Sequence, residues 1–255
     1  MERANTTPRE KGAPRVEESP PATAHTPAER LAELAAWGVD LSLVRRQLAL
    51  PPADRVSGLL EAADGLVQRS WWKRLWHPTL HPQPPRRLFE QLRGACEWVL
   101  VGRLAESAHG APFLAHQVEV CFLPTADNVA RLVAALAPLR PHLLAGTRRE
   151  RSPHWFTTEG ERLLLAQPAL VLETEAALVC LQSELVGVGA YPAVRAASTP
   201  LDLYGGAVLV LTLPAELAWR QARSESVDEV AIPQLEAALL LSATAPAPAV
   251  PAGER

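Results

Sequence analysis

The apolar positions of residues 26–69 repeat at the three- and four-residue spacing that is typical of amphipathic helices. Thr26 followed by Pro27 and Glu29 predicts a helix start, because threonine caps the first turn and glutamate completes a capping box. We expect helices over 27–37, over 40–48 and from Pro51 onward. Helices this short cannot bury a core alone, so their leucine and valine faces should pack on the rest of the chain.

Beyond residue 88, helical and strand patterns alternate. The expected helices cover 88–95, 104–109, 128–139 and 214–223, and the expected strands cover 98–101, 116–122, 163–167, 169–174, 177–182 and 207–211. Helices that precede and flank a mixed sheet of short strands are typical of an α+β domain. We therefore predict an α+β fold, a mixed β-sheet flanked by helices, with an N-terminal helical segment.

Composition divides the chain further. The predicted parts are a disordered tail (1–25), a helical segment (26–69), a linker rich in tryptophan and proline (70–87), an α+β domain (88–241) and a second disordered tail (242–255). The tails are rich in proline and poor in large apolar residues, so they cannot contribute to a core.

Charge and hydropathy narrow the class of protein. The formal net charge is -3, so bulk electrostatics does not recruit nucleic acid or an anionic membrane. The N-terminus is too charged for a signal peptide, and we find no run of 18 uncharged apolar residues. Cys96, Cys121 and Cys180 form an odd set without a CxxC pair, which favours reduced, buried thiols. We expect a cytoplasmic protein without a membrane role, with a composition typical of bacteria.

Trp71, Trp72 and Trp76 stand among Lys73 and Arg74 in the linker. Aromatic and basic residues together can stack on single-stranded nucleic acid or lie at a membrane surface. Three tryptophans at a domain junction favour a structural role instead, in which they anchor the helical segment to the following domain.

The segment "VLVGRLAESAHGAPFLAHQVEVCF" (99–122) predicts a strand, a glycine turn, a short helix and a second strand. Backbone amides at such a turn and at the helix start can hold a phosphate. A metal-dependent phosphate reaction also needs carboxylates on the next strand, and Glu119 is the one carboxylate there.

Several stretches of the sequence follow one another in the same order as the motifs of one known superfamily. "WVLVGRLAESAHGAP" resembles its strand, glycine turn and helix, and "HQVEVCF" stands where its Asp-x-Asp strand belongs. "TADNVARLVAALAPL", "LVCLQSELVGVGAYPAV" and "LVLTLPAELAWRQA…VDEVAIPQLEAAL" resemble the helix after it, the strand with a third aspartate, and the closing helices. Residues 86–241 thus resemble the nucleotidyltransferase-fold superfamily, which includes DNA polymerase beta, the bacterial minimal nucleotidyltransferases and the toxin-type AbiEii group. Residues 27–69 resemble a short polypeptide often found beside such nucleotidyltransferases.

The resemblance implies a catalytic site that this chain has lost. The three aspartate positions, which in active members hold Mg²⁺, correspond to Gln117, Glu119 and Cys180. Cys180 is a soft ligand, and one carboxylate out of three cannot hold two magnesium ions. The second small residue of the turn is Arg103, which is far bulkier than the family's glycine or serine.

The likeness also implies anion-binding positions. Gly102 and Arg103 stand at the phosphate turn, and Arg220 stands near a lysine that helps hold the triphosphate. Asp228 matches an aspartate of the same region, while the lysine before it is Val227. Arg220 has an alternative interpretation as a solvated helix charge, and Arg103 is either an anion ligand or a plug in the old nucleotide site.

We therefore predict a catalytically degenerate nucleotidyltransferase-fold protein that needs no metal cofactor. It would be a binding or regulatory module for a nucleotide, RNA or protein partner, with a possible toxin-antitoxin connection. The alternatives are an active nucleotidyltransferase with an altered Mg²⁺ site and a purely structural subunit.

Overall fold

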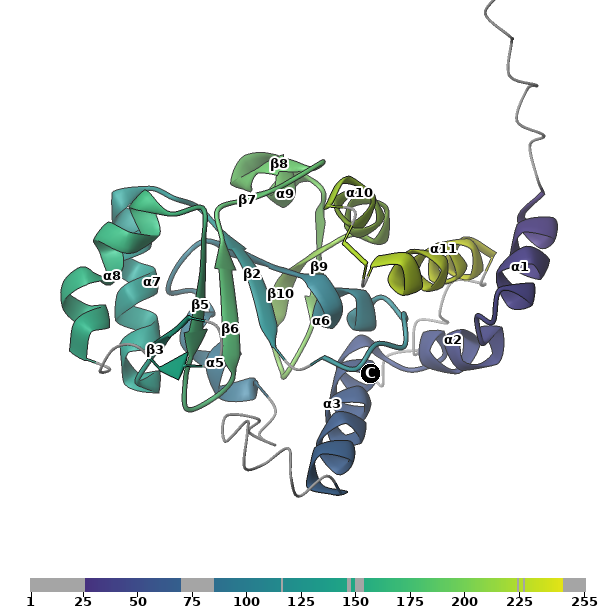
Figure 1. The fold of residues 1–255 in the computed structure, drawn as a ribbon, viewed down its shortest axis with the longest axis horizontal. Helices are drawn as coiled ribbons and strands as arrows, with labels where there is room; N and C mark the ends of the chain where they lie inside the picture. The colour runs from purple at the N-terminus through teal and green to yellow at the C-terminus, as the bar shows by residue number, and fades with distance from the viewer. Residues whose placement is uncertain are drawn as a thin grey trace, which may run out of the picture.

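The structure is a computed structural model that describes residues 26–69, 85–115, 117–145, 148–149, 154–223, 225–226 and 228–244. The predictions for the tryptophan cluster, for most of the linker, for the N-terminal tail and for 245–255 lie outside these residues. Residues 242–244, which we assigned to the C-terminal tail, are instead the end of a helix. Within them, the chain forms a mixed β-sheet with helices packed around it (Figure 1). The prediction of an α+β fold is confirmed.

Most of the predicted helices and strands are present, with ends shifted by a few residues, and the structure adds elements that the sequence did not predict. The helices are α1 (Pro27–Ala36), α2 (Leu41–Leu48), α3 (Pro52–Arg69), α5 (Arg86–Leu92), α6 (Gly102–Ala108), α7 (Ala126–Leu136), the short 3-10 helix η1 (Ala137–Leu139), α8 (His154–Ala166), α9 (Tyr191–Ala196), α10 (Leu213–Arg223) and α11 (Asp228–Thr244). The strands are β1 (Trp98–Val101), β2 (Val118–Phe122), β3 (His142–Ala145), β4 (Arg148–Arg149), β5 (Ala169–Glu173), β6 (Leu178–Gln182), β7 (Glu184–Leu185), β8 (Gly189–Ala190), β9 (Ser198–Asp202) and β10 (Ala207–Leu211).

The main sheet has the strand order β4-β3-β5-β6-β2-β1-β10-β9, while β7 and β8 form a separate hairpin. At its centre, β1 pairs antiparallel with β2 and parallel with β10, and β2 pairs parallel with β6. The register places Glu119 of β2 between Val101 of β1 and Cys180 of β6. The three residues therefore lie side by side on one face of the sheet.

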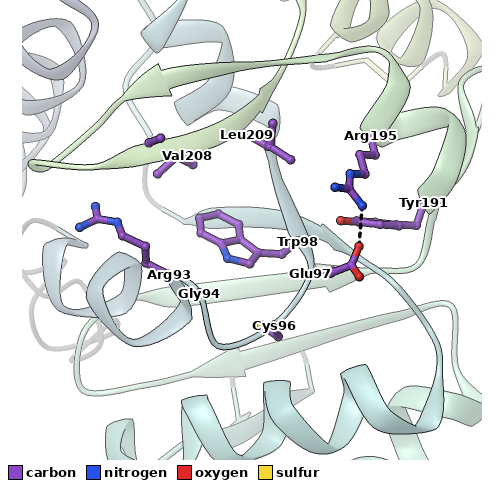
Figure 2. Close-up of a pocket in the computed structure, with 10 residues that line it drawn as sticks. Arg93, Gly94, Cys96, Glu97, Trp98, Tyr191, Arg195, Val208 and Leu209 are labelled. Atoms are coloured by element: carbon purple, nitrogen blue, oxygen red, sulfur yellow. Dashed lines mark hydrogen bonds and ion pairs between the residues drawn. The ribbon is translucent and has the colours of Figure 1, made fainter.

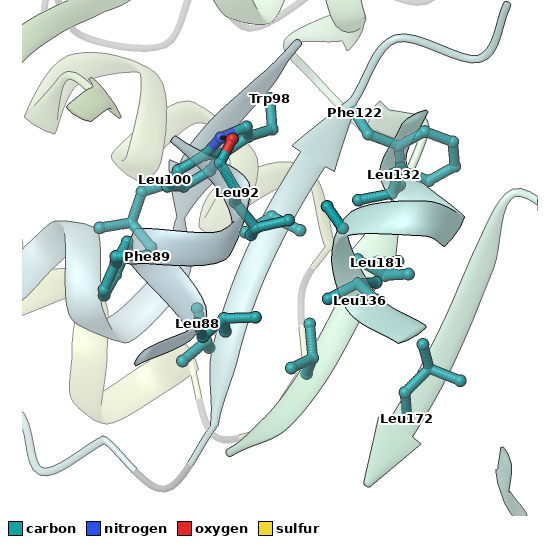
Figure 3. Packing of buried hydrophobic residues seen from close by; sticks show 14 of the residues in the cluster. Leu88, Phe89, Leu92, Trp98, Leu100, Phe122, Leu132, Leu136, Leu172 and Leu181 are labelled. Carbon is teal, nitrogen blue, oxygen red and sulfur yellow. Dashed lines mark hydrogen bonds between the residues drawn. The ribbon is translucent and has the colours of Figure 1, made fainter. Parts of the chain in front are cut away.

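The opposite face carries the larger hydrophobic core. Leu100 and Phe122 of the central strands point to this face and are fully buried. Helices α5, α7 and α8 cover it, and Figure 3 shows Leu88 and Phe89 of α5 and Leu132 of α7 packed above the strands. Continuous burial of both faces explains why β1 and β2 read as apolar runs with little polar alternation.

The face that carries Glu119 is covered by α9 and α10. Val99, Val101 and Cys121 of the strands pack against Tyr191 of α9 and Trp219 of α10 in a second cluster. Glu119 is therefore a charged residue on a face that is otherwise closed by apolar packing.

The N-terminal helices dock on the domain, as their apolar faces predicted. Leu34 of α1 and Val44 of α2 are fully buried, and they cluster with Leu235 of α11. Figure 1 shows α1 and α2 beside α11. Thr26 and Glu29 form the predicted capping box, which sets the start of α1. From α3, Arg55 donates to the carbonyl of Ala108 at 2.7 Å, which joins this segment to the end of α6.

One predicted strand is wrong. Residues 163–167 do not form a strand, because Leu163 to Ala166 are the last turn of α8. Phe156 and Leu164, which both face the core, are eight residues apart and so lie on the same side of a helix. A short apolar run does not distinguish a strand from a buried helix end, and the sequence carries no strong signal for the start of α8.

Candidate functional site

The turn after β1 is built around Gly102, which has φ 71 and begins α6. This is the left-handed region that favours glycine. A Cβ atom at this position would overlap Oε1 of Glu119, so the carboxylate of Glu119 lies directly against the turn. Conformation and close packing therefore both require glycine here.

Glu119 and Cys180 are register partners on neighbouring strands, and Glu119 is only 6% exposed. Gln117 lies just before β2 and is half-buried, two positions from Glu119 along the chain. The structure thus places two of the three aspartate-like positions next to each other and the third immediately before the strand.

The chemistry of these three side chains does not suit magnesium. Burial raises the pKa of the Cys180 thiol to about 12, and the neighbouring carboxylate of Glu119 adds to this shift. The thiol is therefore protonated at neutral pH and is a poor ligand. With the amide of Gln117, the set offers a single carboxylate where Mg²⁺ requires several hard oxygen ligands. In the described part of the chain, no group of three or more His, Cys, Asp or Glu side chains could hold a metal ion.

Arg220 lies at the centre of a buried ionic network. It is 2% exposed, its Nε donates to Oε1 of Glu106 at 2.6 Å, and its Nη1 donates to Oδ1 of Asp228 at 2.8 Å. Arg223 donates to the same Asp228 through Nη2 at 2.8 Å. The network joins α6, α10 and α11, and the alternative interpretation of Arg220 as a solvated helix charge is wrong.

Asp228 is the ionised acid of this network. Burial opposes ionisation, but the hydrogen bonds from Arg223 and Arg220 lower the pKa of Asp228 to about 2. Charge-assisted hydrogen bonds of this kind are stronger than neutral ones and hold the start of α11 against α10.

Glu216 binds the glycine turn. The backbone N–H of Gly102 donates to Oε1 of Glu216 at 2.8 Å, and the Glu216 side chain is fully buried. Burial raises the pKa of Glu216 well above its ordinary value, and the nearby Glu106 raises it further. Oε1 of Glu216 thus accepts the backbone N–H of Gly102, a donor that could otherwise bind a phosphate oxygen.

The network also contains buried atoms without a hydrogen-bond partner among the described residues. They are Oε2 of Glu106, Oε2 of Glu216 and Nη2 of Arg220. Burial raises the pKa of Glu106, an effect that the charge of Arg220 opposes. The cluster is thus incompletely neutralised and depends on Arg220 for its stability.

Arg103 contacts an aromatic side chain that follows α6. Its guanidinium carbon lies 5.0 Å from the centroid of the Phe113 ring, which is a cation–π contact. The Ser107 hydroxyl donates to the Arg103 carbonyl at 2.7 Å and so fixes its backbone. The hypotheses that Arg103 binds an anion or plugs the site stay predictions.

His109 stands at the C-terminal end of α6. Burial lowers the pKa of His109 to about 4, so the imidazole is neutral and gains nothing from the negative pole of the helix dipole. Its Nε2 lies 2.9 Å from the carbonyl oxygen of Leu211, which makes Nε2 the protonated nitrogen.

Sequence reasoning missed Glu106 and Glu216, the two acids that organise this site. A usable signal was present, because Glu106 stands among small and apolar residues in the second half of its helix, and Glu216 precedes Arg220 by four residues. What the sequence lacked was any sign that these side chains point inward and meet at the same turn.

Comparisons with known proteins add no family. A scan against protein-family models and a search of the curated proteins both found no match. No helix in the part of the chain that the structure describes has the length and apolar character needed to cross a membrane.

Proposed function

We propose that the protein is a noncatalytic binding or regulatory module built on a nucleotidyltransferase-like arrangement. The order α5-β1-α6-β2-α7, the antiparallel β1–β2 pair and the parallel β2–β6 pair support the likeness. The contact between the Gly102 turn and Glu119 supports it further, because a phosphate turn and a metal-binding strand meet in this way in that superfamily.

The observation that carries the proposal is the hydrogen bond from Gly102 N–H to Glu216. An amide that could bind a phosphate oxygen instead binds a carboxyl group of the same chain. Arg220, the cation near the expected triphosphate position, is likewise engaged by Glu106 and Asp228. Groups that would act on a substrate now stabilise the fold.

The same interactions argue against transfer chemistry. Nucleotidyl transfer requires two metal ions that bridge the phosphates and activate the attacking oxygen. Gln117, Glu119 and protonated Cys180 do not supply the ligands, so the activity that we propose is binding without turnover.

The test compares the unmodified protein with Glu216→Ala and Glu216→Gln. Isothermal titration of ATP with and without Mg²⁺ measures binding, and chromatography of the nucleotides measures turnover. We expect no turnover from any of the three proteins, and tighter ATP binding by Glu216→Ala because the amide of Gly102 is freed. Glu216→Gln keeps an acceptor oxygen and should behave like the unmodified protein. Magnesium-dependent turnover of a nucleotide by the unmodified protein would contradict the proposal and favour an altered but active site.

A second test addresses the aspartate-like positions. The triple variant Gln117→Asp, Glu119→Asp, Cys180→Asp places three hard carboxylates at these positions. Its Glu119→Asp change also shortens the side chain that lies against Gly102 by one methylene group. It should gain a magnesium-dependent rise in melting temperature that the unmodified protein lacks. A folded triple variant that is indifferent to Mg²⁺ would count against the likeness to nucleotidyltransferases.

A further inference from the structure

A small pocket lies at the beginning of β1, about 13 Å along the chain from Gly102 at its other end. Its volume is about 230 Å³, and its lining comes from the α5–β1 loop, from α9 and from the start of β10. Figure 2 shows the Trp98 indole between Arg93 on one side and the pair of Glu97 and Arg195 on the other. This pocket is separate from the buried network of the candidate site.

The apolar walls of the pocket are fixed before any ligand arrives. The Trp98 indole donates to the carbonyl of Leu92 at 3.1 Å and is 8% exposed. Arg93 donates to the carbonyl of Leu203 at 3.0 Å, and its guanidinium lies so close to Gly206 that a Cβ there would overlap it. Val208 and Leu209 of β10 close the wall opposite the loop (Figure 2).

The polar end of the pocket is an ion pair in contact with water. Arg195 Nη1 lies 2.8 Å from Glu97 Oε2, and the two side chains are 57% and 43% exposed. The Asn128 side chain holds the backbone of Glu97 at both its N–H and its carbonyl, while the Glu97 carboxylate pairs with Arg195. Exposed pairs contribute little to stability, so this pair can open and exchange partners.

Tyr191 adds a neutral hydroxyl beside this pair. Burial raises the pKa of Tyr191 to about 12, and the Glu97 carboxylate adds to the shift while Arg195 opposes it. Figure 2 shows the hydroxyl end of Tyr191 directed toward Glu97 and Arg195. The polar end therefore offers a cation, an anion and a hydroxyl within one small space.

We propose that this pocket binds a free amino acid with a branched aliphatic side chain. Opening the ion pair presents Arg195 to a carboxylate and Glu97 to an ammonium group, which is the charge pattern of a zwitterion. The aliphatic side chain then lies beside Trp98 and Val208, which are neighbours on the same face of the sheet. The volume equals that of roughly seven or eight water molecules, which matches a ligand of this size better than a nucleotide.

The direct test uses L-leucine as the probe with the full chain, measured by isothermal titration and by ligand-observed NMR. We expect saturable binding at one site. Two analogues separate the charges, because 4-methylpentanoic acid lacks the ammonium group and isoamylamine lacks the carboxylate. Each analogue should bind about tenfold more weakly than leucine, since each loses one charge-assisted hydrogen bond.

Matched variants locate the site. Arg195→Met should weaken leucine and 4-methylpentanoic acid about tenfold, and Glu97→Gln should weaken leucine and isoamylamine to a similar extent. The control pair is Arg162 and Glu159 of α8, which has a similar separation of 3.1 Å and similar exposures of 69% and 42%. Arg162→Met and Glu159→Gln should leave leucine binding unchanged.

Ala207→Phe tests the pocket without touching a charge. Ala207 is exposed at the start of β10, where an aromatic residue suits a strand, so the variant should fold and fill the pocket. We expect loss of leucine binding at an unchanged melting temperature. Absence of saturable leucine binding, or binding that survives both Arg195→Met and Ala207→Phe, would overturn the proposal. Equal affinity for leucine and 4-methylpentanoic acid, together with unchanged leucine binding by Glu97→Gln, would also overturn the proposal.

Discussion

The two ends of β1 hold ion pairs of opposite kinds. At the Gly102 end, Arg220 and Glu106 are 2% and 0% exposed, whereas at the Trp98 end Arg195 and Glu97 are 57% and 43% exposed. The buried pair joins α10 to α6 and cannot open without leaving charges in a medium of low dielectric constant. The exposed pair is solvated whether it is closed or open, so each of its two charges can exchange its partner. Charged residues near one strand thus serve as structure at one end and remain available for a ligand at the other.

The largest expected effect comes from breaking each pair by the same change. Arg220→Met should lower the free energy of unfolding by about 3–5 kcal/mol, because Glu106 is left buried without its cation and Asp228 keeps only Arg223. Arg195→Met should lower it by about 0–1 kcal/mol. Urea denaturation of both variants measures the difference, and equal losses would show that the two ends do not differ in this way.

The second effect is a pH dependence confined to the buried end. Glu216 has a pKa raised above the ordinary 4.5, with Glu106, Glu119 and Arg220 as its charged neighbours. The folded state therefore holds a proton that the unfolded state releases. Its contribution to stability is complete below pH 4.5 and decreases as the pH rises toward the folded pKa, by about 1.4 kcal/mol per pH unit.

Glu216→Gln removes this titration and keeps an acceptor for Gly102. Stability measured by denaturation from about pH 5 to about pH 8 should therefore fall less steeply in Glu216→Gln than in the unmodified protein. Parallel profiles for the two proteins would mean that Glu216 is ionised in the folded state.

The third comparison uses a glycine from each end. Gly102 has φ 71 and lies against Glu119. Gly94 in the pocket lining has φ 70, and an added Cβ atom there would meet no other atom within 4 Å. Gly94→Ala should cost about 1–2 kcal/mol from backbone strain alone. Gly102→Ala should cost about 1–3 kcal/mol more, because it also displaces the Glu119 carboxylate. Thermal unfolding of both variants tests this, and equal losses would show that Glu119 moves aside freely.

The smallest effect is the salt dependence of the two pairs. At about 1 M salt the Debye length is about 3 Å, so the small loss expected for Arg195→Met should vanish. The loss for Arg220→Met should persist, because salt does not reach a pair inside the protein. Denaturation at low and high salt checks this, and a salt-sensitive Arg220→Met would indicate that water enters the network.

Much of the local structure was predictable because its causes are local. The capping box of Thr26 and Glu29 joins residues three apart, and the apolar spacing of α1, α2 and α7 follows the helical repeat. The strand predicted over 163–167 is wrong because a few apolar residues suit either a strand or a buried helix end.

The sequence by itself determined the N-terminal helices, the glycine turn and the apolar central strands. Only the tertiary structure decided which charges are buried and which remain in water. Glu106 meets Arg220, and Gly102 meets Glu216, across separations of 114 residues in each case. Such partners are chosen by strand order and helix packing, and the burial that makes their charges costly to separate exists only once the chain has folded.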